Sequence, residues 1–172
     1  MGREDQGLGR STGRYQVVPR VLCFVTHDDE VLLLRVGAHK RLWAGLYNGV
    51  GGHIEPGEDI QSAAIREVRE ETGLEPRQIR LCGVVHVDVD NPVLGVVFFV
   101  FTVVAEDKRV VASREGALAW FKKDALPAKE MVEDLQALLP MALSMGPADH
   151  PFFALYTYDE QDHLVISFAA RP

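Results

Sequence analysis

The chain has 172 residues, a formal net charge of -7 and 47% hydrophobic residues. This length suits one globular domain with a sizeable core, whereas the negative charge and the lack of a long basic stripe argue against nucleic acid as a partner. The longest apolar run, residues 93–105, is broken by Gly95 and Thr102 and is shorter than the roughly 20 residues of a membrane span. We therefore expect no interaction with nucleic acid and no membrane association.

The first 16 residues mix glycine with charged side chains and lack the apolar segment of a secretory signal. We expect a disordered tail over residues 1–16 and a single domain over residues 17–172. Cys23 and Cys82 lie in apolar runs and form no CxxC pair, which favours buried thiols in a reducing compartment. The sequence therefore predicts a cytoplasmic protein.

Runs rich in β-branched and aromatic residues predict strands over residues 17–26, 31–36, 78–89, 93–105 and 117–121, and a closing hairpin over residues 152–158 and 163–168. A helix is predicted over residues 60–72, because Asp59 is a good N-cap and Gly73 a good helix stop. Apolar residues at helical spacing predict a second helix over residues 130–139, ending at Pro140. This order of elements favours an α/β sandwich built on a mixed sheet.

The first predicted helix carries an unusual group of carboxylates. Glu67, Glu70 and Glu71 fall within an arc of roughly 100° on the helical wheel, on the side that also holds small apolar residues. They repel one another and lie near the helix C-terminus, where the helix dipole disfavours negative charge. Arg66 can neutralise only part of this charge. A hard divalent cation such as Mg²⁺ would satisfy the carboxylates and bind substrate phosphates, and the alternative is a solvated, salt-bridged helix face.

A glycine-rich loop precedes this helix, and glycines let a backbone approach a ligand closely. The stretch from residue 52 to residue 74 fits the pattern G-x5-E-x7-R-E-U-x-E-E-x-G-U, with Gly52, Glu58, Arg66, Glu67, Val68, Glu70, Glu71, Gly73 and Leu74 at the fixed positions. This stretch resembles the Nudix box, the signature of the MutT-like hydrolases. The resemblance covers residues 17–145 and leaves a C-terminal hairpin extension at residues 151–169.

The resemblance implies a Nudix-type α/β/α sandwich with a mixed β-sheet, and hydrolysis of a nucleoside diphosphate linked to a further group with Mg²⁺ or Mn²⁺. By position, Glu70, Glu71 and the carbonyl of Gly52 would bind metal. Glu67 would be a ligand or the base that activates water, and Arg66 would orient it. Glu58 would support the loop or bind a second metal.

The sequence departs from the family pattern at one position. Many members place an acidic residue immediately before a downstream tryptophan, but here Ala119 precedes Trp120. Glu115 lies nearby, either as a substitute for that acidic residue or as a solvated loop glutamate. The assignment of the catalytic base therefore rests on Glu67.

The residues before the box resemble the branch that hydrolyses oxidised purine nucleoside triphosphates such as 8-oxo-dGTP. In that branch the asparagine equivalent to Asn48 reads the purine edge, which suits an amide that donates and accepts hydrogen bonds, and Asp134 matches a base-reading aspartate. His53 would contact phosphate. Trp43, Tyr47 or Phe24 would stack on the base, although Phe24 better suits a place in the core. The alternatives are a turn asparagine, a surface aspartate and a loop histidine without a role.

The leading hypothesis is a metal-dependent nucleoside triphosphate pyrophosphohydrolase that releases a nucleoside monophosphate and pyrophosphate. Alternative substrates are ADP-ribose, dinucleoside polyphosphates and nucleotide sugars. A non-catalytic nucleotide sensor is the alternative from a different class. The sequence leaves three roles open for the C-terminal hairpin, which would extend the sheet, cover the pocket or form a homodimer contact.

Overall fold

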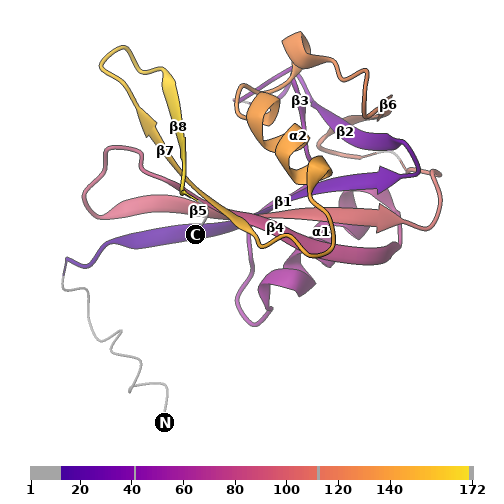
Figure 1. The fold of residues 1–172 in the computed structure, drawn as a ribbon, viewed down its shortest axis with the longest axis horizontal. Helices are drawn as coiled ribbons and strands as arrows, with labels where there is room; N and C mark the ends of the chain where they lie inside the picture. Colours follow the sequence, from indigo (N-terminus) through magenta and orange to yellow (C-terminus); the bar gives the residue numbers. More distant parts are fainter. Residues whose placement is uncertain (1–12, 41, 112, 171–172) are drawn as a thin grey trace.

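The computed structural model describes residues 13–40, 42–111 and 113–170. Its centre is an eight-stranded sheet in the order β3-β2-β1-β5-β4-β7-β8, with β6 paired to β2 (Figure 1). The strands are β1 (Gln16–His27), β2 (Glu30–Val36), β3 (Tyr47–Asn48), β4 (Pro76–Val87), β5 (Leu94–Ala105), β6 (Gly116–Lys122), β7 (Phe152–Tyr158) and β8 (Leu164–Phe168). The sheet is mixed, because β1 pairs with β5 and β4 with β7 in parallel while the remaining pairs are antiparallel. The predicted strands and hairpin are confirmed, with ends shifted by at most two residues.

Two helices cover opposite faces of this sheet (Figure 1). Helix α1 (Ile60–Thr72) buries Ala63, Ala64 and Val68 in a core that includes Cys23 and Leu32. Helix α2 (Leu135–Ser144) packs into a second core, which contains the strand neighbours Phe24 and Leu33. Because successive strand residues point to opposite faces, the apolar strands serve both cores. The predicted α/β/α sandwich is confirmed.

The predicted boundaries of α1 are also confirmed. The Asp59 carboxylate accepts hydrogen bonds from the backbone N–H groups of Gln61 and Ser62 at 2.9 and 3.0 Å. At the other end Gly73 has a φ of 72°, a left-handed conformation that glycine adopts without strain. Both ends of the helix that carries the box are therefore determined by local sequence.

The boundaries predicted for the second helix were wrong. Residues 128–130 form a short 3-10 helix, η2 (Ala128–Glu130). The chain is then extended at Met131, because its backbone forms a parallel β-bridge with that of Tyr47. Helix α2 starts at Leu135 and continues through Pro140 to Ser144. Burial of Leu138, Leu139 and Ala142 in the core favours the helix despite the backbone hydrogen bond that the proline cannot make.

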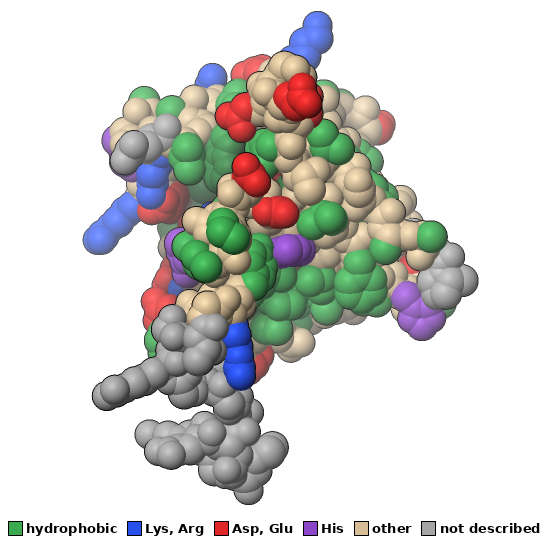
Figure 2. All heavy atoms as spheres, turned by 90° about the vertical axis from the view of Figure 1, so that its left-hand side faces the viewer, with side chains coloured by type: hydrophobic (Ala, Val, Ile, Leu, Met, Phe, Trp, Pro, Cys, Tyr) green, Lys and Arg blue, Asp and Glu red, His purple; other side chains and the backbone are tan. Residues whose placement is uncertain are grey.

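The C-terminal hairpin extends the sheet, because β7 lies parallel to β4. Its exposed apolar side chains are Phe153, Leu155, Tyr158, Val165 and Phe168. Figure 2 looks at this end of the molecule and shows apolar side chains gathered on it. A homodimer contact through this hairpin stays a prediction.

Three further expectations concern the ends and the interior of the chain. The tail predicted over residues 1–16 lies mostly outside the described residues. Cys23 and Cys82 are both buried and unpaired, as predicted. No described helix has the length and apolar character needed to cross a bilayer.

Candidate active site

The glycine-rich loop is fixed along strand β1. The Val21 N–H donates to the carbonyl of Gly52 at 2.9 Å, and the Cys23 N–H donates to the carbonyl of Val50 at 2.7 Å. The backbones of Arg20 and His53 form an antiparallel β-bridge. On its other side the loop touches α1, since a Cβ at residue 52 would collide with the Glu67 carboxylate. A side chain at residue 52 would therefore force the Glu67 carboxylate out of its position.

Arg66 is the centre of an ion-pair cluster beneath the loop. Its guanidinium donates to both oxygens of Glu58 at 2.8 and 3.1 Å, to Glu67 Oε1 at 2.9 Å and to Glu70 Oε2 at 3.2 Å. It also donates to the backbone carbonyl of His53 at 3.0 Å. The bonds from Arg66 lower the pKa of Glu58. Arg66 thus joins the loop to the helix and holds the Glu67 side chain in place.

Glu71 has a different environment. Its Oε2 accepts a hydrogen bond from the Gly51 N–H at 3.2 Å, but the carboxylate belongs to no ion pair within the described chain. Burial raises its pKa to about 8, and the charges of Glu67 and Glu115 add to this shift. Burial also raises the pKa of Glu67, against the opposing effect of Arg66. Burial and the neighbouring carboxylates therefore disfavour the charged forms of Glu67 and Glu71 where the loop meets the helix.

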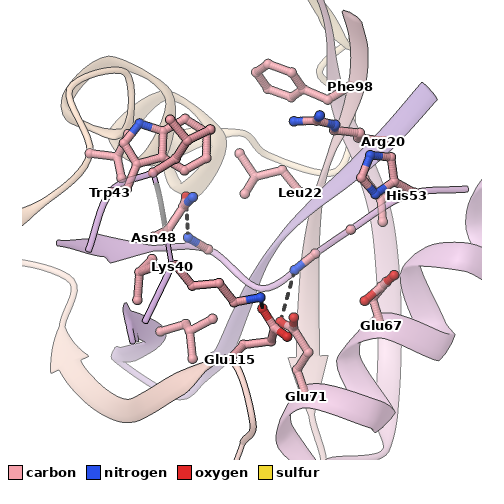
Figure 3. Close-up of a pocket in the computed structure, with 18 of the residues that line it drawn as sticks. Arg20, Leu22, Lys40, Trp43, Asn48, His53, Glu67, Glu71, Phe98 and Glu115 are labelled. Atoms are coloured by element: carbon pink, nitrogen blue, oxygen red, sulfur yellow. Dashed lines mark hydrogen bonds and ion pairs between the residues drawn. The ribbon is translucent and has the colours of Figure 1, made fainter. Parts of the chain in front are cut away.

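A cleft of about 670 Å³ opens above these two glutamates (Figure 3), a size typical of small-molecule sites. Three residues predicted to bind substrate, Asn48, Asp134 and His53, line it. Trp43 lines it as well, whereas Tyr47 packs edge-on against Phe121.

The sequence analysis missed other residues of this cleft: Arg20, Lys40 and Phe98. Arg20 and Phe98 are paired neighbours on the parallel strands β1 and β5. The only sequence signal was a charged residue in an otherwise apolar predicted strand. The pairing that brings these side chains to the loop could not be inferred from it.

Asn48 makes the local bond expected of a turn residue. Its Oδ1 accepts a hydrogen bond from the Gly49 N–H at 2.8 Å. This bond leaves the side-chain NH₂ group and one lone pair of Oδ1 available to a ligand. Asn48 therefore offers the cleft two N–H donors and one remaining acceptor site.

Asp134 is not an ordinary surface residue. Its Oδ1 is shielded from solvent and has no hydrogen-bond partner, and its Oδ2 lies 3.4 Å from the Tyr156 hydroxyl. Burial raises the pKa of this carboxyl group to about 6. The unpartnered oxygen lies in a residue that lines the cleft.

Glu115 also lines the cleft and forms an ion pair with Lys40. Figure 3 shows this pair beside Glu71. Ala119, which occupies the position where many family members carry an acid, lies within β6 opposite Leu33 of β2. Glu115 therefore approaches the acidic site from a different position in the sequence.

The residues around Glu71 suit a divalent cation, although the described residues contain no group of three acidic, histidine or cysteine side chains spaced to hold one. Glu67 and Glu71 line the cleft, while the Glu70 side chain is 61% exposed and pairs with Arg66. Carboxylate and carbonyl oxygens are the ligands that Mg²⁺ prefers. A buried carboxylate without an ion pair is stabilised by such a cation.

Sequence comparison finds relatives of part of the chain. The NAD-capped RNA hydrolase NudC of Pseudomonas entomophila (strain L48) is 38% identical over 68 residues, which make up 40% of this chain and 24% of that protein. The chain thus spans about a quarter of the length of the curated relatives that it matches.

Structure comparison extends the similarity to most of the chain. The mutator MutT protein from Bacillus halodurans aligns with a TM-score of 0.74 and 25% identity, covering 91% of this chain and all of that one. The NUDIX domain of Shewanella oneidensis NrtR, solved with ADP-ribose, aligns with a TM-score of 0.63 and 15% identity over 83% of this chain and 97% of that one. The family model described as the NUDIX domain matches residues 17–141. The loop, the capped helix and the surrounding sandwich are thus those of a Nudix domain, and the chain belongs to the Nudix family.

Proposed function

We propose that the protein is a pyrophosphohydrolase, dependent on Mg²⁺ or Mn²⁺, that cleaves a nucleoside triphosphate to a nucleoside monophosphate and pyrophosphate. The observation that carries this proposal is the pair Glu67 and Glu71 lining the cleft beside the glycine-rich loop. Glu71 is half-buried, and the described chain supplies no ion pair for it. The charged form of Glu71 is therefore unfavourable unless a cation pairs with it.

The ligands proposed for the cation are Glu70, Glu71 and the carbonyl oxygen of Gly52, and Glu67 is proposed either as a further ligand or as the base. When bound, Mg²⁺ or Mn²⁺ would neutralise phosphate charge and lower the pKa of water. Glu67 would accept the proton of the attacking water, and the Arg66 Nη1 at 2.9 Å would hold its carboxylate in position. The bonds that Glu58 accepts from Arg66 and from the Glu55 N–H support a role in the loop rather than at a second metal.

The proposed substrates are oxidised purine nucleoside triphosphates, including 8-oxo-dGTP. The Asn48 NH₂ group would donate to a purine acceptor, and Asp134 Oδ1 would accept a hydrogen bond from a ring N–H. An oxidised purine carries an N–H at position 7 where guanine has only an acceptor. An unpartnered buried carboxylate oxygen in the cleft supports selection of that donor, because unmet hydrogen bonds penalise the wrong substrate.

A second candidate function is hydrolysis of NAD-type dinucleotides. The specific observation in its favour is the 38% identity to NudC over 68 residues. The net charge of -7 opposes binding of an RNA strand. Under this second candidate we therefore expect the free dinucleotide, rather than capped RNA, to be the substrate.

The test is a nucleotide panel assayed with purified protein and Mg²⁺. The panel contains 8-oxo-dGTP, dGTP, NADH, ADP-ribose and a dinucleoside polyphosphate, and the assay scores released pyrophosphate against other products. We expect monophosphate and pyrophosphate from the triphosphates, with kcat/KM for 8-oxo-dGTP at least about tenfold above that for dGTP. EDTA should abolish turnover.

Preferential cleavage of NADH would replace the leading function by the second candidate. Tight nucleotide binding without turnover in Mg²⁺ or Mn²⁺ would instead identify a sensor. Glu71→Gln is the matched control for the panel, because it removes one carboxylate charge from the proposed metal site at nearly constant side-chain volume.

A further inference from the structure

Two side chains of the cleft contain polar atoms that are shielded from solvent and lack a hydrogen-bond partner. Within the described residues such atoms are Arg20 Nε, His27 Nδ1 and Asp134 Oδ1. Arg20 and Asp134 line the same cleft. Native structures pair nearly all buried polar groups, so an unpaired group in a cleft marks a position where a ligand completes the hydrogen bonding. Asp134 has a role in the proposed function, whereas Arg20 has none.

The loop determines where Arg20 lies relative to the proposed chemistry. The loop begins at Asn48 and ends at His53. Between these residues, the Gly51 N–H donates to Glu71, and Gly52 lies against the Glu67 carboxylate. At this far end the backbone of Arg20 forms a β-bridge with that of His53. Figure 3 shows Arg20 beside His53 and Phe98, on the opposite side of the cleft from Trp43 and Asn48. A ligand lying along the loop would therefore meet Asn48 first, the two glutamates next and Arg20 last.

The charges around the cleft leave Arg20 available to an anion. Lys40, another cation lining the cleft, pairs with Glu115, and Arg66 is occupied by three glutamates. In the described part of the chain no carboxylate pairs with Arg20. A guanidinium presents a planar set of donors that matches a phosphate group. The end of the loop at His53 thus has the charge and the hydrogen-bond donors of a phosphate-binding site.

We propose that Arg20 binds the terminal phosphate of a nucleoside triphosphate, an inference that rests on the proposed function. With the base near Asn48 and the scissile anhydride beside Glu67 and Glu71, the outermost phosphate reaches the end of the loop where Arg20 and His53 lie. A dinucleotide would place an uncharged nucleoside there. Arg20 therefore selects triphosphates over NADH and remains in contact with the pyrophosphate product.

The test compares Arg20→Gln with wild type on 8-oxo-dGTP, dGTP and NADH. We expect KM for both triphosphates to rise about tenfold or more, since a charge-assisted hydrogen bond contributes at least that factor to binding. The kcat for triphosphates and the KM for NADH should change little. Calorimetric titration with inorganic pyrophosphate and Mg²⁺ should show a similar loss of affinity, and Arg20→Lys should recover part of it.

Arg69→Gln is the matched control, because it also removes one arginine charge. Arg69 pairs with Glu75 at 2.7 Å and is not among the residues that line the cleft. Its KM values and pyrophosphate affinity should equal those of wild type. Thermal melting of both variants checks that the fold is intact.

Three outcomes would overturn the inference. Unchanged KM and pyrophosphate affinity in Arg20→Gln would show that the guanidinium does not contact the substrate. An equal rise of KM for NADH would place it on the shared diphosphate instead. Wild-type pyrophosphate affinity in Arg20→Gln together with a large fall in kcat would indicate a different role. If wild type cleaves no nucleotide but binds pyrophosphate through Arg20, the proposed function fails while this phosphate site stands.

Discussion

The polar groups around the box fall into two regions that differ in how they are paired. Beneath the loop, Arg66 bonds to Glu58, Glu67, Glu70 and the His53 carbonyl, so each guanidinium nitrogen has a partner. Above the loop, the cleft contains an unpartnered Arg20 Nε and Asp134 Oδ1 and a Glu71 carboxylate outside any ion pair of the described residues.

This difference separates Arg66 and Glu58, which join the loop to the helix, from the cleft groups that lack a partner. Glu67 and Glu70 belong to both sets, because Arg66 pairs with them and they are proposed to act at the cation. Paired groups stabilise the loop against the helix, so their loss should destabilise the fold. Unpaired groups are held by the surrounding fold at a cost in stability, which is common at functional sites. Their loss should reduce activity without loss of stability. The substitutions below test this separation.

The largest effect is expected for Glu71→Gln. Loss of a proposed metal ligand should lower kcat by about a thousandfold, because a bound metal supplies several kcal/mol of transition-state stabilisation. In EDTA the melting temperature should stay the same or rise, since a carboxyl group whose charged form is disfavoured by burial is replaced by a neutral amide. Steady-state kinetics and calorimetry measure the two effects. A large fall in stability with near-normal turnover would place Glu71 among the structural groups.

Arg66→Met should instead lower the stability of the fold. Without the guanidinium, Glu58, Glu67 and Glu70 lose their common partner and repel one another, so we expect the melting temperature in EDTA to fall on the order of 5 °C. Arg69→Met is the matched control, because its ion pair with Glu75 is about half exposed and contributes little. Equal melting temperatures for the two variants would contradict the structural role of Arg66.

Asn48→Ala should raise KM for 8-oxo-dGTP about tenfold, with a smaller change in kcat, if the amide reads the base. Asn48→Asp separates base reading from the turn. It keeps an acceptor for the Gly49 N–H but removes the NH₂ donors. A raised KM in both variants supports base reading, whereas normal kinetics in Asn48→Asp would leave only the local bond as the role of Asn48.

The smallest effect concerns stability as a function of pH at Asp134. Its folded-state pKa is raised to about 6. The contribution of the Asp134 carboxyl to the free energy of unfolding is therefore fully present below the unfolded-state pKa and is lost as pH rises through 6. Asp134→Asn should therefore gain stability relative to wild type between pH 4.5 and 7.5, on the order of 1 kcal/mol. Urea unfolding of both proteins at the two pH values measures this gain. A pH-independent difference would contradict the raised pKa.

Local sequence was sufficient for much of the fold. Asp59 and Gly73 mark the ends of α1 through bonds and a backbone conformation that involve only neighbouring residues. The strands were recognisable from their β-branched composition, and the box glutamates from their spacing. The second helix was misplaced because Met131 pairs with Tyr47, a contact far away in sequence that extends the chain where periodicity favoured a helix.

By itself the sequence determined the strands and the position of the acidic helix, because caps, periodicity and spacing act over a few residues. The family and its α/β/α layers were implied by the resemblance of residues 52–74 to the Nudix box. Tertiary structure alone decided which charges meet. It pairs Glu70 with Arg66, brings Glu115 and Lys40 beside Glu71, and aligns Arg20 with His53 at the end of the loop. Whether a charged group finds a partner depends on strand pairing and burial between distant segments, and no local pattern records those contacts.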